Sequence, residues 1–359
     1  MAEITGCRVI GRQSLAEISL TPRTLLDELH GLFSCAEGLF NTARHRRTYG
    51  VAGETFVAYS DLEGYLNAVD MAVASHGAGT ARNARIFIGV AGENGCPSIT
   101  WRASHFEERR VETFLAPTRY RMYHYQPLSY WQIYDRQTAT GLQILGGADQ
   151  YPAWDLGSPL RNFLQWHLAS RDGALIHAGT LGVKDKGVLL AGVGGSGKSG
   201  TVLSGILSGL TTVGDDYVFV TPSSLRAYPL FETLKQDAAG LKRLGLTDHP
   251  SMPAKTNWQG KYQFYMRDLG LHDLPVSLSL NALLLPRISG QEQTTLTPVS
   301  AKEAFLALAP SGVTQIPGDR PLLYATAGEI SRQLPCFRLD LGSDPDEVYT
   351  TIRQFIEEM

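Results

Sequence analysis

The stretch Gly187–Val220, GVLLAGVGGSGKSGTVLSGILSGLTTVGDDYVFV, decides how the chain folds. Its residues Gly192 to Ser199 follow the phosphate-binding pattern of a glycine, any four residues, and then Gly-Lys-Ser. The apolar run Val188–Ala191 predicts a buried strand before this motif, and the residues after Lys198 predict a helix. Strand, glycine loop and helix therefore follow one another in the order of a phosphate-binding loop.

The residue types of this loop suit a bound nucleotide. Glycines can take positive φ and turn backbone N–H groups inward, and the N-terminus of the following helix adds a partial positive charge. Lys198 can reach the β- and γ-phosphates, and the Ser199 hydroxyl can hold Mg²⁺. An ordinary glycine turn is the alternative. We predict ATP and Mg²⁺ as cofactors, and the predicted nucleotide-binding residues are Gly192, Val193, Gly194, Gly195, Ser196, Gly197, Lys198, Ser199 and Gly200.

Two acids, Asp215 and Asp216, stand directly before Tyr217–Val220, an apolar run that predicts a strand. A metal–nucleotide site needs a carboxylate near the hydroxyl ligand, and a kinase needs a base for the acceptor hydroxyl. Adjacent acids can divide these roles, because the charge on one raises the pKa of the other. The alternative is that the acids only cap a turn before the strand.

The stretch Pro159–Val220 resembles the catalytic domain of HPr kinase/phosphorylase and its relatives, which share a P-loop fold with phosphoenolpyruvate carboxykinase. The shared layout is a His, the glycine loop and an Asp-Asp pair: His177 lies fifteen positions before Gly192, and Asp215 lies sixteen positions after Ser199. The resemblance implies that Asp215 is the general base for a serine hydroxyl and that Ser199 and Asp216 are Mg²⁺ ligands.

The same resemblance implies a catalytic role for Lys198 on the phosphates and for His177 beside the phosphate or behind the metal. The alternative for His177 is a hydrogen-bonded core residue. The chain departs from HPr kinase itself, because Gly200 replaces a Glu or Thr and the Glu-Ile-Arg-Gly signature is absent. It is closer to HPr-kinase-like proteins with a late Leu-Pro-Arg-x-Ser-Gly segment, here Leu285–Gly290, in a region of weaker similarity from Asn281 to Gly342. Kinases of lasso-peptide tailoring belong to this superfamily.

The implied activity is ATP-dependent transfer of a phosphoryl group to a hydroxyl, foremost a serine of a peptide, protein or small metabolite. The reverse phosphorylase reaction stays open, as does a homo-oligomer. A non-catalytic nucleotide-binding sensor is the alternative function. Asp215 and Asp216 together favour catalysis, because a binding module needs only the acid on the metal side.

The length of 359 residues predicts two domains. We expect a smaller β-rich α+β domain over 1–155 and a P-loop domain with a mixed sheet over 156–359, an α/β (α+β) class overall. The formal net charge of −3 gives no reason to expect nucleic acid. There is no apolar leader and no long apolar run, which predicts a cytoplasmic protein without a membrane span. The cysteines lack metal or disulfide spacing and are expected to be reduced; they are Cys7, Cys35, Cys96 and Cys336.

Outside the motif, the pattern is less specific. The apolar stripe in Leu25–Phe40 predicts a helix, and Ser98–Gly147 predicts a small antiparallel sheet, with a ligand groove as the alternative. The long stretch Thr247–Leu274 predicts a functional loop or lid. A cation from this region could cover the transferred phosphoryl group, or could simply be solvated. The candidates are Lys255, Lys261, Arg267 and, farther along, Arg287.

Overall fold

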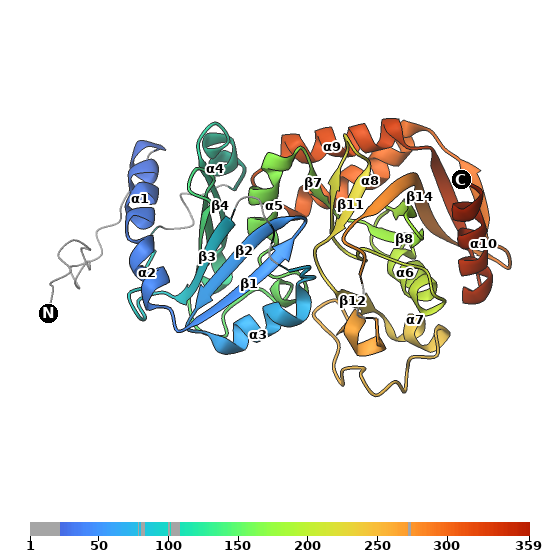
Figure 1. The fold of residues 1–359 in the computed structure, drawn as a ribbon, viewed down its shortest axis with the longest axis horizontal. Helices are drawn as coiled ribbons and strands as arrows, with labels where there is room; N and C mark the ends of the chain where they lie inside the picture. The colour runs from blue at the N-terminus through green and yellow to red at the C-terminus, as the bar shows by residue number, and fades with distance from the viewer. Residues whose placement is uncertain (1–21, 78, 80–82, 100, 102–107, 272–273) are drawn as a thin grey trace, which may run out of the picture. The chain divides into compact units, whose positions relative to one another are not determined.

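The computed structural model describes residues 22–359, apart from 78, 80–82, 100, 102–107 and 272–273 (Figure 1). Cys7 and the predicted absence of a leader lie outside these residues. The chain is of the mixed α/β class and divides into two compact units. The first unit holds Met1–Arg47, Val57–Glu63 and Ala84–Pro152, and the second holds Thr48–Phe56, Gly64–Asn83 and Ala153–Met359.

A mixed sheet with the order β1-β2-β3-β6-β5-β4 is built from the described residues before position 146. β3 runs parallel to β6, whereas β4, β5 and β6 form an antiparallel meander. The predicted antiparallel sheet is therefore only part of a larger mixed one. The strands are β1 (His45–Val51), β2 (Glu54–Ser60), β3 (Asn83–Val90), β4 (Tyr120–Tyr125), β5 (Tyr130–Asp135) and β6 (Thr140–Leu145).

Helices and aromatic side chains enclose the core of the first unit. The predicted helix over Leu25–Phe40 is helical but interrupted at Cys35, and Leu29 and Phe40 from it are buried with Trp131 and Ile133. Aromatic strand residues thus pack in the core, as their pattern most often indicates. The helices before position 116 are α1 (Pro22–Ser34), α2 (Ala36–Thr42), α3 (Glu63–Ala72) and α4 (Glu108–Leu115).

The second unit is organised on a sheet with the order β15-β16-β14-β11-β10-β7 in the described chain, and β9 pairs with both β14 and β8. β14 lies parallel to both β9 and β16, while its contact with β11 is antiparallel. The strands are β7 (Ala174–Ile176), β8 (Gly179–Val183), β9 (Lys186–Leu190), β10 (Val218–Thr221), β11 (Arg226–Pro229), β14 (Leu278–Gln291), β15 (Thr295–Pro298) and β16 (Cys336–Gly342).

Both faces of this sheet are covered, which explains the unbroken apolar run in β9. Successive strand residues point to opposite faces. Leu189 therefore packs in a core cluster with residues of α8 and α9, whereas Leu190 packs in a second cluster with residues of α6 and α10 (Figure 1). The helices of the second unit after position 160 are α5 (Arg161–Leu168), α6 (Lys198–Leu207), α7 (Ala238–Arg243), α8 (Ala301–Gln315), α9 (Arg320–Gln333) and α10 (Pro345–Glu358).

The stretch Thr247–Leu274 contains more regular structure than its composition predicts. Within it, β13 (Tyr262–Tyr265) pairs antiparallel with β12 (Thr233–Gln236), and a 3₁₀ turn, η5 (Met266–Leu269), follows. Phe264 and Met266 are buried in the cluster that also holds Leu203 and Ile206 of α6. The second half of the stretch is therefore anchored to the same core as α6.

Among the described residues, no helix has both the length and the apolar content needed to cross a bilayer.

Candidate functional site

The glycine loop joins β9 to α6, as the motif predicts. Gly192, Gly195 and Gly197 have φ values of 155°, 82° and 103°. A Cβ at Gly197 would lie 2.4 Å from Cδ1 of Leu341, so both backbone conformation and space require glycine there. The loop thus turns sharply at the carboxyl end of β9 and delivers Lys198 and Ser199 at the first turn of α6.

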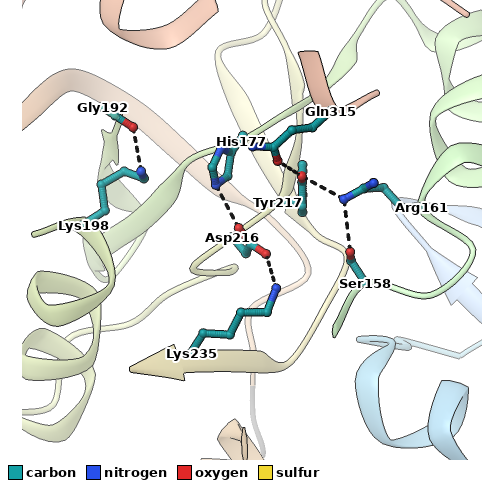
Figure 2. Close-up of polar contacts among 9 residues, drawn as sticks. All are labelled: Ser158, Arg161, His177, Gly192, Lys198, Asp216, Tyr217, Lys235 and Gln315. Atoms are coloured by element: carbon teal, nitrogen blue, oxygen red, sulfur yellow. Dashed lines mark hydrogen bonds and ion pairs between the residues drawn. The ribbon is translucent and has the colours of Figure 1, made fainter. Parts of the chain in front are cut away.

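Lys198 is held inside the loop. Its side chain is buried, and Nζ donates a hydrogen bond to the carbonyl oxygen of Gly192 at 2.7 Å (Figure 2). Burial lowers the pKa of Lys198, and the negative charges of Asp215 and Asp216 oppose this shift. The ammonium group therefore lies within electrostatic reach of both acids, although a neutral carbonyl is its hydrogen-bond partner.

Asp215 is almost completely buried, with 3 % of its surface exposed. Burial, reinforced by the charge of Asp216, raises the pKa of Asp215 to about 6, although the nearby Ser199 hydroxyl, Lys198 and Lys235 act in the opposite direction. Its Oδ1 atom is buried and has no hydrogen-bond partner among the described residues. This carboxyl group can therefore take up a proton near neutral pH and has an oxygen free for a ligand.

Asp216 is engaged on both oxygens. Oδ1 accepts a hydrogen bond from Nε2 of His177 at 2.9 Å, and Oδ2 accepts one from Nζ of Lys235 at 2.7 Å (Figure 2). Burial alone would raise the pKa of Asp216, but Lys235 and His177 outweigh it and hold the pKa well below its usual range. The two adjacent acids therefore differ in pKa: Asp216 stays ionised far below neutral pH, whereas Asp215 changes its protonation state near pH 6.

His177 reaches this position because β7 and β10 are antiparallel neighbours in which Ile176 pairs with Val218. The residues just beyond this pair, His177 and Tyr217, consequently lie side by side. Their rings stack with centroids 5.2 Å apart, and the Nδ1 atom of His177 is buried without a partner in the described structure. The structure therefore brings His177 to the acid pair, where the predicted layout requires it.

Tyr217 is fixed by a small polar network that the sequence did not indicate. Its hydroxyl accepts a hydrogen bond from Nη1 of Arg161 at 2.9 Å and donates one to Oε1 of Gln315 (Figure 2). The guanidinium carbon of Arg161 lies 4.8 Å from the Tyr217 ring centroid, and its Nη1 also donates to Ser158. Burial raises the pKa of Tyr217, so this phenol stays neutral and acts as a rigid support for His177.

Four cations were predicted to face the phosphates. Among them, Lys261 acts electrostatically on Lys198 of the loop and lowers its pKa. Arg267 instead forms a bidentate ion pair with Glu232, in which Nε and Nη2 each donate to a carboxylate oxygen at 2.9 Å. Arg287 pairs with Asp340 at 2.6 Å and leaves 59 % of its side chain exposed. Lys255 is exposed. These pairings favour Lys261 over the two arginines as a cation near the nucleotide loop.

Lys235 is the site residue that sequence reasoning missed. It lies on β12, nineteen positions after Asp216, in a short strand that no motif marks. Its position is set by the pairing of β12 with β13 and by packing of that pair on α6. Neither is visible in the local sequence, because Thr233–Gln236 is too short and too polar to predict a strand.

Gly200 lies at the first turn of α6, against β12. A Cβ at this position would lie 3.2 Å from Nε2 of Gln236. Farther along the helix, a Cβ at Gly205 would lie 2.6 Å from Cδ2 of Leu181. The glycines inside α6 therefore allow close packing on both sides of the helix, which offsets their low helix propensity.

The site suits Mg²⁺ only with phosphate oxygens as further ligands. No group of three or more His, Cys, Asp or Glu side chains that could hold a metal ion occurs in the described parts of the chain. Mg²⁺ usually takes one or two protein oxygens and fills its octahedron with phosphates and water. The Ser199 hydroxyl and the Asp216 carboxylate, each of whose oxygens keeps a lone pair, provide such a partial set.

Comparison of the chain with protein-family models and with curated proteins finds no match. The resemblance to HPr-kinase-like proteins therefore stays a prediction based on the motif and its spacing.

Proposed function

We propose that the chain is an ATP-dependent kinase that transfers the γ-phosphoryl group to a hydroxyl, in a peptide, a protein or a small metabolite. Its second unit would then be a P-loop domain of the HPr-kinase-like type. One observation carries the proposal: the glycine loop holds the Lys198 ammonium within electrostatic reach of two acids, the partly exposed Asp216, which is ionised, and the buried Asp215, which has a pKa of about 6. A mere phosphate-binding turn has no use for a second, differently tuned acid.

The residues divide the work of phosphoryl transfer. Backbone N–H groups of the loop and Lys198 hold the β- and γ-phosphates, and Ser199 with Asp216 forms the side that would hold Mg²⁺. The ion, when bound, neutralises phosphate charge that develops during transfer. Asp216 can serve this side despite its two hydrogen bonds, because each carboxylate oxygen has a further lone pair.

Asp215 is the base in this proposal. The acceptor oxygen attacks the γ-phosphorus in line, and a bond forms between them as the bond to the β–γ bridging oxygen breaks. The electron pair of that broken bond leaves with ADP, and the hydroxyl proton passes to Asp215. A base works best when its pKa lies near the operating pH, which the value of about 6 satisfies.

The test is transfer of labelled γ-phosphate from Mg-ATP to free serine, other hydroxyl metabolites, small peptides and lysate proteins. Wild type would be compared with Asp215→Asn and with a control, Asp248→Asn, whose carboxyl group is exposed. We expect a labelled product that falls by about 10²–10⁴-fold with Asp215→Asn and is unchanged in the control. Tight Mg-ATP binding without any labelled product would instead identify a nucleotide sensor.

A further inference from the structure

Lys235 belongs to the acid pair, although no motif includes it. Its side chain is 16 % exposed and that of Asp216 is 20 % exposed, so their contact at 2.7 Å is not a solvated surface ion pair. The charge of Lys235 also acts on Asp215, where it lowers the pKa. Two cations, Lys198 and Lys235, thus act on the same two neighbouring carboxylates, Asp215 and Asp216.

Phosphoryl transfer commonly needs more than one cation around the γ-phosphoryl group. Protein kinases, for example, use two Mg²⁺ ions that an Asp and an Asn side chain hold. In the part of this chain that the structure describes, no cluster offers a full metal cage, and the ionised Asp216 already holds an ammonium group. A lysine can replace an ion here because its ammonium is a compact point charge with three N–H donors.

The donors of Lys235 are only partly used. One N–H group is directed at Oδ2 of Asp216, and Asp216 is the hydrogen-bond partner that the described residues provide. Gln263 lies opposite Lys235 in the β12–β13 pair, and Gly157 lies close by, since a Cβ there would be 2.9 Å from Nζ. The absence of a side chain at Gly157 leaves the ammonium group room on that side.

We propose that Lys235 is a catalytic cation that contacts the transferred phosphoryl group and takes the place of a second divalent ion. The inference rests on the proposed function. Asp216 aims the ammonium group at the γ-phosphoryl oxygens, while Lys198 holds the β–γ side. As the acceptor oxygen bonds to the γ-phosphorus and the bond to the ADP oxygen breaks, Lys235 neutralises charge on the equatorial oxygens and exchanges no proton.

A competing explanation is that Lys235 only neutralises Asp216. In that case its removal would leave an uncompensated carboxylate near the nucleotide, and this charge would also weaken ATP binding. The two explanations differ when Asp216 is neutralised at the same time. A double-mutant cycle of Lys235→Met and Asp216→Asn therefore separates them.

The experiment is calorimetric binding of Mg-ADP, Mg-ATP and Mg-ADP with aluminium fluoride, at saturating Mg²⁺, so the acceptor need not be known. We expect Lys235→Met to leave the Mg-ADP affinity within about twofold, because ADP lacks the γ-phosphoryl group. Loss of one charge-assisted hydrogen bond should weaken Mg-ATP by about tenfold and the aluminium fluoride complex by more. Lys235→Arg should restore part of the difference, and Lys242→Met, an exposed lysine on α7, should change nothing.

The double variant decides between the explanations. If Lys235 contacts the γ-phosphoryl group, the preference for Mg-ATP over Mg-ADP stays depressed when Asp216→Asn is added. A preference restored to the wild-type value would overturn the inference and leave the proposed function intact, as would an unchanged preference in Lys235→Met. Wild-type protein that binds neither nucleotide would instead overturn the proposed function, and this inference with it.

Discussion

The glycine loop and the β12–β13 pair each deliver a lysine to the same two acids, but they hold it differently. Lys198 bonds to the carbonyl oxygen of Gly192, a neutral partner within its own loop. Lys235 bonds to the carboxylate of Asp216, which lies on a different element. Removing Lys198 therefore leaves no charged side chain without its hydrogen-bonded partner, whereas removing Lys235 leaves a largely buried carboxylate with one cation fewer. In the proposed function, Lys198 therefore acts mainly on the nucleotide, whereas Lys235 acts on the nucleotide and also stabilises the fold.

Of the two lysines, Lys198 of the glycine loop should have the larger effect on activity. Lys198→Ala removes the cation that would hold the β- and γ-phosphates, so we expect Mg-ATP affinity to fall at least about tenfold and transfer about 10²–10³-fold. Calorimetry and the labelled-phosphate assay measure these two losses. Wild-type turnover in this variant would exclude the phosphate-binding role of the loop.

The pH dependence of the transfer rate should report the ionisation of Asp215. In the proposed mechanism Asp215 is a base only when ionised, and burial together with the charge of Asp216 raises its pKa to about 6. Activity should therefore be level above this pH and fall about tenfold for each unit below it. A profile of kcat/KM between pH 5 and 8 measures this limb. A rate that stays level down to pH 5 would remove Asp215 from the role of base.

In the absence of nucleotide, removing Lys235 should destabilise the fold more than removing Lys198, the reverse of their order in activity. Lys235→Met leaves Asp216 with its His177 contact but without the lysine cation, so we expect a loss of about 1–3 kcal/mol in the free energy of unfolding. Lys198→Met removes one hydrogen bond to a neutral carbonyl and should cost about 1 kcal/mol or less. Urea unfolding of both variants makes the comparison. Equal losses would show that the two lysines are held in the same way.

The smallest effect should come from Gly200→Ala. The new methyl group would meet the amide of Gln236 at 3.2 Å, a flexible side chain that can move aside, while helix propensity improves by about 1 kcal/mol. Stability should change by no more than about 1 kcal/mol, and transfer should stay at the wild-type rate. A large loss of transfer with normal stability would place Gly200 against the nucleotide and not only against β12.

The sequence predicted the elements that have a clear local pattern, such as an apolar run or a glycine motif. The predicted strand over Tyr217–Val220 is present within one residue of those bounds, as β10, and the order of strand, glycine loop and helix around Lys198 is confirmed. The resemblance also implied a position for His177 beside the phosphate or the metal, and the antiparallel pairing of β7 and β10 brings it to the acid pair.

Features that depend on tertiary contacts were missed. α9 was not predicted, although Leu323, Ala327 and Ile330 recur at helical spacing and are buried. β11 and β12 are too short and too polar to stand out, and they are strands because β14 and β13 supply their hydrogen-bond partners. Lys235 was hidden for this reason, since its proximity to Asp216 is a property of the folded sheet.

The most direct test of the account compares wild type and Asp215→Asn in a single experiment at pH 7 that measures Mg-ATP affinity and γ-phosphate transfer together. We expect equal affinities and a transfer rate that falls by at least about 10²-fold in the variant, because the phosphate-binding residues stay and the proposed base is removed. Equal transfer rates in the two proteins would contradict the central claim that this buried acid pair performs phosphoryl transfer.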